Sequence, residues 1–108
     1  MKWEMAKQIG YTPVTTLWEQ FEEEEHKGMG EVEELIERSF ELYKNDITCL
    51  TELIMIINHK SWYWYEQGNN KIARFYSELY HEFDERAINH IETNMDDKAM
   101  SYYFKTLD

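Results

Sequence analysis

Chain-breaking residues are scarce in this sequence. Its 108 residues include one proline and four glycines, whereas an all-β domain needs turn signals about every 8–12 residues. This shortage excludes a many-stranded β protein. Between the few breaks, apolar residues recur at helical spacing, so we predict an all-α fold. The expected architecture is a compact helical bundle of four main helices and a short C-terminal helix.

Cysteine and long apolar runs are also scarce. Cys49 is the only cysteine, so no internal disulfide is possible, and this fits a reducing compartment. The first residues, MKWEMAKQIG, lack the continuous apolar segment of a signal peptide. The longest apolar run, Leu53 to Ile57, is far shorter than the about 20 residues that cross a bilayer. We therefore expect a soluble, cytoplasmic protein without membrane association.

Positive charge is the third scarce feature. The chain has 11 Lys and Arg against 22 Asp and Glu, which gives a formal net charge of −11. Nine glutamates lie between residues 19 and 37, and Lys27 is the only cation there, so this segment carries a net charge of −8. Such a surface repels nucleic acid and anionic membranes and favours a basic partner.

The remaining breaks predict an N-terminal arm, residues 1–13, followed by one helical-bundle domain, residues 14–108. Thr16 and Glu19 have the spacing of a capping box, which predicts the start of a first helix. The sequence Gly28-Met29-Gly30 is expected to end that helix. The predicted helices cover about 16–27, about 31–44, about 47–67 and about 71–93, before a short last helix. The expected caps of the later helices are Asn45 or Asp46, Asn69 or Asn70, and Asp96 or Asp97.

The segment 47–67 is apolar on nearly every side. A helix of this kind is normally the buried one, so we predict that it is the central helix of the bundle. One of its apolar stripes, spaced at about 100° per residue, contains Ile47, Leu50, Ile54, Ile57 and Tyr65.

Four aromatic residues in a row, Trp62 to Tyr65, stand at the end of this central helix. Neighbouring side chains on a helix diverge by about 100°, so the run does not form one stacking surface. Trp64 and Tyr65 are expected to pack against neighbouring helices. Trp62 and Tyr63 are expected to stay partly exposed and available to a partner.

Two Glu-x-x-His pairs, Glu23 with His26 and Glu78 with His81, match the pattern of di-metal helical bundles. Those sites need two such pairs and two further glutamates that all project into the core. Helical angles place both pairs opposite the apolar stripes, facing solvent, so we predict no metal site, no cofactor and no catalytic residue. The alternative, a carboxylate and histidine metal enzyme, would use these pairs together with Glu52, His59 and His90.

Three further side chains lie on predicted apolar faces. His90 and Asn58 would either form a small buried polar site or make inter-helical hydrogen bonds, and we favour hydrogen bonds because buried polar groups need partners. Cys49 lies in an apolar helix of an acidic protein, which would raise rather than lower its pKa. Core packing is therefore expected for Cys49.

The acidic segment and the aromatic run together form the candidate interaction surface. We expect it to bind an unknown protein partner with a basic surface, and the surplus aromatic area also favours a possible homodimer. Its predicted residues are Glu19, Glu22, Glu23, Glu24, Glu25, Glu33, Glu34, Glu37, Trp62 and Tyr63.

Binding of single-stranded nucleic acid is a further alternative. The aromatic run has Lys60, Lys71 and Arg74 nearby, and aromatic side chains beside cations are typical of base-stacking grooves. Three cations in a chain of net charge −11 give little phosphate neutralisation, however. We therefore predict no nucleic-acid binding.

The stretch LTELIMIINHKSWYWYEQGNNKIARFYSELYHEFDERA, with TTLWEQF before it and YYFKTLD at the end, resembles a family of small uncharacterised proteins of phages and mobile elements in Firmicutes and other gut bacteria. The resemblance covers about residues 15–108, although the acidic run Glu22 to Glu25 departs from the family's usual sequence. It implies an all-helical fold and a mobile-element context, and it supplies no reaction. We therefore expect a non-enzymatic accessory protein that acts by binding another protein.

Overall fold

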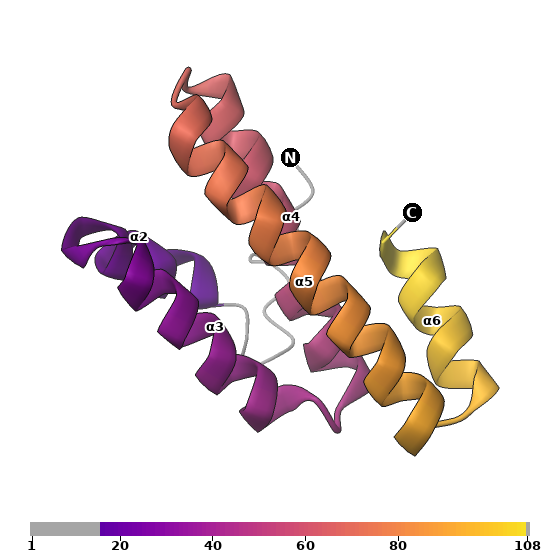
Figure 1. Cartoon of the computed structure of the whole chain (residues 1–108). Coiled ribbons are helices and arrows are strands. Elements are labelled where there is room, and N and C mark those ends of the chain that lie inside the picture. Colours follow the sequence, from indigo (N-terminus) through magenta and orange to yellow (C-terminus); the bar gives the residue numbers. More distant parts are fainter. Residues whose placement is uncertain (1–15, 108) are drawn as a thin grey trace.

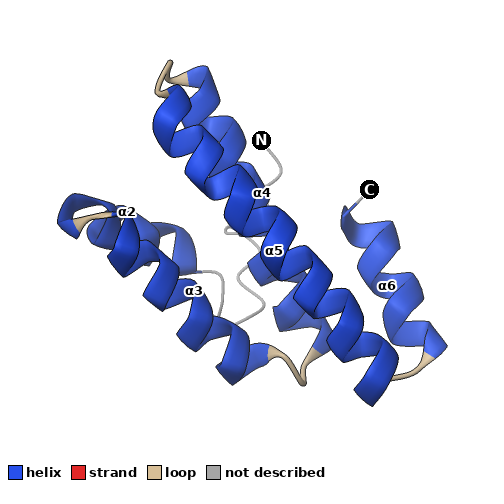
Figure 2. Cartoon of the chain, viewed as in Figure 1, coloured by secondary structure: helices blue, strands red, loops and turns tan. Residues whose placement is uncertain are grey.

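The computed structural model describes residues 16–107, and these residues form helices and no strand (Figures 1 and 2). The all-α prediction is confirmed. The predicted N-terminal arm, residues 1–13, lies outside the described residues. The helices are α2 (Leu17–Lys27), α3 (Met29–Tyr43), α4 (Ile47–Glu66), α5 (Asn70–Asn94) and α6 (Asp97–Leu107).

Three of the helices begin at the predicted caps. The Asp46 carboxylate accepts hydrogen bonds from the backbone N–H groups of Thr48 and Cys49, at 3.1 and 3.2 Å. Asn69 and Asp96 accept equivalent bonds at the first turns of α5 and α6. Each cap satisfies backbone donors that a helix start would otherwise leave without a partner, so short polar turns separate these helices cleanly.

The first helix begins after Thr16 as predicted, but two details near the first helices differ from the prediction. Thr16 makes no side-chain cap hydrogen bond, because its own backbone is already helical (φ −86°, ψ −4°). Its hydroxyl oxygen instead accepts a hydrogen bond from Gln20 Nε2 at 3.1 Å. Gly28, with φ of +140°, makes the whole break by itself in a conformation that favours glycine. Met29 and Gly30 therefore belong to α3 and do not end α2.

The central position predicted for 47–67 is confirmed, since α4 contacts each of the other described helices. In Figure 1, α4 and α5 lie side by side, with α2 and α3 on one side of the pair and α6 on the other. Leu50, Ile54 and Ile57 of α4 have no exposed surface. No helix within residues 16–107 has the length and apolar character that crossing a membrane requires.

The C-terminal end of α4 differs from the prediction. Tyr65 is 60% exposed instead of packed, while Lys60, a candidate surface cation, is completely buried. Trp62 (57% exposed) and Tyr63 (36%) are partly exposed as predicted. α2 does reach this end of α4, where Trp18 packs against Tyr63 and Glu25 accepts a hydrogen bond from Trp64. Tyr65 is exposed because it lies about 200° around the helix from Tyr63 and so points away from α2.

Candidate functional site

A buried ion pair holds α2 against α4. The distance between Lys60 Nζ and Glu25 Oε2 is 3.1 Å, and the two side chains are 1% and 9% exposed. The Lys60 ammonium also lies 4.2 Å from the centre of the Trp18 ring, where the negative face of the ring attracts a cation. Glu25 is therefore not part of an open acidic surface, because its carboxylate is turned into the protein.

The same carboxylate oxygen also accepts hydrogen bonds from two aromatic side chains. Trp64 Nε1 of α4 donates to Glu25 Oε2 at 3.1 Å, and the Tyr76 hydroxyl of α5 donates to it as well. Hydrogen bonds to a charged acceptor are stronger than those between neutral groups. Glu25 thus joins three helices through one oxygen atom, and this explains why Trp64 is held in place while its neighbours in the aromatic run are exposed.

Within the buried ion pair, the ammonium group of Lys60 has a shifted pKa. Burial lowers the pKa of Lys60, although the nearby Glu25 carboxylate partly offsets this effect. A lysine with a lowered pKa has the chemistry of a nucleophile or a general base. With its side chain 1% exposed, Lys60 is out of reach of a substrate in this conformation. The geometry therefore assigns it a structural role.

A second ion pair connects α3 with α5. Two nitrogens of the Arg86 guanidinium donate to the two Glu37 oxygens at 2.7 and 3.1 Å, a fork geometry that favours arginine. The guanidinium carbon lies 4.8 and 4.4 Å from the ring centres of Phe40 and Phe83. The hydrogen bond from Arg86 lowers the pKa of Glu37. Glu37 is therefore paired between two helices as Glu25 is, but its side chain stays 46% exposed.

The remaining predicted glutamates lie on the outside of α2 and α3. Glu24 is partly buried, and its carboxylate lies 3.3 Å from Lys27 Nζ. Glu23, Glu33 and Glu34 are exposed, and within residues 16–107 they form no ion pair. We use the name acidic surface for the exposed predicted residues, which are Glu19, Glu22, Glu23, Glu33 and Glu34.

The two exposed aromatics of the predicted surface lie on different sides of α4. Tyr63 packs edge-on against Trp18 of α2, with ring centres 5.7 Å apart. Trp62 follows Lys60 by two positions, about 200° around the helix, and so it points away from α2. The structure therefore places Tyr63 beside α2 and separates Trp62 from the acidic surface.

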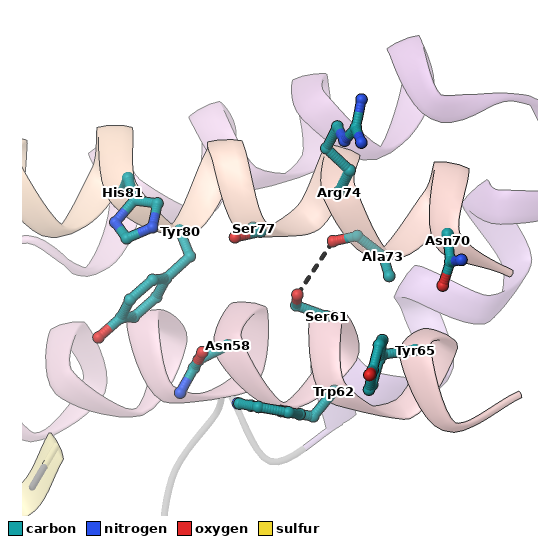
Figure 3. A pocket seen from close by; sticks show the side chains of 10 residues that line it. All are labelled: Asn58, Ser61, Trp62, Tyr65, Asn70, Ala73, Arg74, Ser77, Tyr80 and His81. Atoms are coloured by element: carbon teal, nitrogen blue, oxygen red, sulfur yellow. Dashed lines mark hydrogen bonds between the residues drawn. The ribbon is translucent and has the colours of Figure 1, made fainter. Parts of the chain in front are cut away.

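Trp62 instead lines a groove of about 580 Å³ between α4 and α5. Figure 3 shows the floor of this groove, where the Ser61 hydroxyl donates to the backbone oxygen of Ala73 at 3.0 Å. A hollow of this volume is within the range of about 300–1,000 Å³ found for binding pockets. The α4–α5 groove is lined by Asn58, Ser61, Trp62, Tyr65, Asn70, Ala73, Arg74, Ser77, Tyr80 and His81.

The Glu-x-x-His pairs do not meet in the core. Glu23 and His26 are exposed on α2, and Glu78 and His81 are exposed on α5, which confirms the outward orientation expected from the helical angles. Among residues 16–107, no group of three or more His, Cys, Asp and Glu side chains is arranged to hold a metal ion. Of these four residues, His81 lines the α4–α5 groove.

The remaining polar candidates are His90, Asn58 and Cys49. His90 Nε2 lies 3.0 Å from Asn45 Oδ1, in the turn between α3 and α4, and His90 Nδ1 lies 3.1 Å from the Asn94 amide. His90 is therefore hydrogen-bonded as favoured, but its partner outside α5 lies in a turn and the bond is exposed, so the predicted buried inter-helical bond is not formed. Asn58 is not its partner, because Asn58 lines the α4–α5 groove. Cys49 is buried, and burial together with Asp46 raises its pKa to about 11.

No protein-family model matches the chain, and comparisons with curated proteins and with solved structures found no match. The functional interpretation therefore depends on the chain's own residues.

The burial of Lys60 was not predicted, although its position along the helix indicates it. Lys60 follows Leu53 and Ile56 by seven and four residues, so it continues a buried stripe of α4.

Two buried tyrosines predict a loss of stability at alkaline pH. Tyr76 donates to Glu25, and Tyr103 donates to Asp84 Oδ1 at 2.5 Å. Burial, and then the hydrogen bond to a carboxylate, raises the pKa of both phenols. The folded state therefore keeps two protons that the unfolded chain loses above about pH 10. Stability from these groups is fully present below that pH and is lost as the pH rises.

The measurement is urea unfolding between about pH 10.5 and 11.5, where the opposite contribution of the lowered Lys60 pKa fades, because lysine in the unfolded chain loses its proton near about pH 10.4. Each tyrosine contributes a slope of about 1.4 kcal/mol per pH unit, so we expect the two phenols to lower the free energy of unfolding by about 3 kcal/mol across this range. Cys49, with a pKa raised to about 11, adds to the fall in the lower part of the range. Tyr103→Phe should remove the share of one phenol, about 1.4 kcal/mol per pH unit. An unchanged slope in this variant would contradict the assignment of the effect to the buried phenol.

Proposed function

We propose that this protein is a cytoplasmic, non-enzymatic accessory protein that binds a basic segment of another protein through its acidic surface. The observation that carries the proposal is a division among the glutamates of α2 and α3. Glu25 and Glu37 pair with Lys60 and Arg86 and fix the two helices on the bundle. Glu23, Glu33 and Glu34 of the acidic surface are exposed and form no ion pair within residues 16–107.

This arrangement suits electrostatic recognition. The acidic surface belongs to two helices that are tied to α4 and α5 by ion pairs, so the backbone that carries its charges is held in place before a partner arrives. Clustered charge of one sign accelerates encounter with an oppositely charged partner and makes binding depend on salt. The resemblance to small phage and mobile-element proteins supports an accessory role in that setting.

Nucleic-acid binding has less support from the structure than from the sequence. Lys60, one of the three cations beside the aromatic run, is buried against Glu25 and is not available to a phosphate. Trp62 and Tyr63 also lie on different sides of α4. Among the described residues that line the groove with Trp62, Arg74 is the only lysine or arginine.

The test compares two variants of equal charge. Glu23→Gln/Glu33→Gln/Glu34→Gln neutralises part of the acidic surface, and Glu78→Gln/Glu85→Gln/Glu92→Gln removes the same charge from exposed positions of α5. Affinity capture from a bacterial lysate should yield a basic partner that binds saturably and is released by high salt. Because the first variant lacks three exposed carboxylates of the acidic surface, we expect it to bind about tenfold more weakly.

The α5 variant is expected to bind as the unmodified protein does. Equal weakening by the two variants would show that only the total charge matters. The absence of any saturable, salt-sensitive partner would overturn the proposal.

A further inference from the structure

We propose that the α4–α5 groove is a self-association surface, at which a second copy of this chain binds across a two-fold axis. The inference concerns a different surface from the acidic one and does not depend on the proposed function. It rests on the shape of the groove, on its relation to α6 and on the distribution of charge.

The groove has a hollow and a projection side by side. Small residues, Ser61, Ala73 and Ser77, line its middle, and Trp62 and Tyr65 stand at its edge. These two aromatics are 57% and 60% exposed and pack edge-to-face, with ring centres 5.9 Å apart. A two-fold interface requires one patch that is complementary to itself. A projecting tryptophan beside a hollow meets this requirement, because each copy offers both parts.

The groove continues an interface that the chain already uses. Tyr103 of α6 reaches Asp84 of α5, and Asp84 follows Ser77 by seven residues, two turns along the same stripe. With 11 residues, about 16 Å, α6 covers less than half of the 25-residue α5. The α4–α5 groove is the part of this seam that α6 does not reach, and no other helix within residues 16–107 covers it.

The distribution of charge also favours the α4–α5 groove as the contact between two copies. Two chains of net charge −11 repel each other over most of their surfaces. None of the described residues that line the groove is an Asp or Glu, and Arg74 stands on its rim with the guanidinium directed away from α4 (Figure 3). Trp62 points about 200° away from Lys60, which faces α2. A dimer through the groove therefore keeps the two acidic surfaces away from the contact.

Salt should therefore strengthen the dimer, since it screens the repulsion between the two acidic chains. Salt weakens binding of a basic partner to the acidic surface. The affinities of the two interactions therefore change in opposite directions when salt is added. This difference separates failure of the present proposal from failure of the proposed function.

Sedimentation velocity over a range of protein concentrations, at low and high salt, tests the proposal. We expect a monomer–dimer equilibrium that shifts toward dimer at high salt. Trp62→Ala should weaken association by about thirtyfold or more, as for a tryptophan at the centre of an interface. Ser77→Leu, which fills the hollow, should weaken it as well. Leu42→Ala is the matched control, because Leu42 is 72% exposed on α3, away from the groove.

Far-UV circular dichroism and urea unfolding show whether each variant is folded. Trp62 is largely exposed, so its truncation is expected to leave the fold intact and the result interpretable. A monomer at every concentration and salt, or equal weakening by Trp62→Ala and Leu42→Ala, would overturn the proposal. Loss of the dimer in Tyr102→Ala/Phe104→Ala with no effect of Trp62→Ala would place the contact on α6 and would also overturn it.

Discussion

Replacing Lys60 by methionine is expected to lower the free energy of unfolding by about 3–5 kcal/mol, as for other buried ion pairs that lose one partner. The Glu25 carboxylate would remain inside the protein with Trp64 and Tyr76 as its donors among residues 16–107. Methionine retains most of the aliphatic volume of lysine, so the loss would report on the missing charge and not on a cavity. Urea unfolding at neutral pH, followed by circular dichroism, measures the change.

Two further variants make this experiment specific. Lys71→Met removes an exposed cation from α5, and its effect should stay within about 0.5 kcal/mol. Combining Lys60→Met with Glu25→Gln removes both charges while leaving an acceptor for Trp64 and Tyr76. Because the uncompensated charge is then gone, the double variant should recover much of the lost stability. A Lys60→Met protein within about 1 kcal/mol of the original, roughly the net worth of one exposed pair, would contradict the buried pair.

Truncation of Ile54 to alanine is expected to cost about 2–5 kcal/mol, as for other buried large-to-small substitutions. Ile54 has no exposed surface and lies in α4, the helix that contacts every other described helix. Loss of its side-chain atoms leaves a cavity that surrounding helices fill only in part. The same urea unfolding experiment measures the change.

Leu42→Ala is the control for Ile54→Ala, because it removes a similar volume from an exposed helical position. Its effect should remain within about 0.5 kcal/mol. If Ile54→Ala lost well under about 1 kcal/mol, which is below the range for core truncations, α4 would not be the central helix.

The fold followed from local patterns in the sequence. The apolar stripe of α5 and the nearly all-apolar character of α4 predicted which helices are long and which one is central. Asp46, Asn69 and Asp96 predicted where three helices begin. The start of α2 at Thr16 was also predicted, but its cap hydrogen bond was not formed, because a threonine three residues before a glutamate is compatible with a cap and also with the helical backbone that Thr16 adopts.

The candidate site was predicted less completely. Exposure of Trp62 and Tyr63 was expected from their helical angles, and so was the outward direction of both Glu-x-x-His pairs. The exposure of Tyr65 was not, because it depends on which sides of α4 the neighbouring helices cover. A helical angle says which way a side chain points, but not whether another helix is there to cover it.

The sequence by itself determined the all-α class, the order of the helices and the surplus of negative charge on α2 and α3. These properties depend on residue type and on spacing within one segment. Only the tertiary structure decided which glutamates are available to a partner. Glu25 and Glu23 are two residues apart in an acidic run, yet Glu25 meets Lys60 of α4 while Glu23 faces solvent. That choice requires a cation from a distant helix at 3.1 Å, and local spacing carries no information about such a contact.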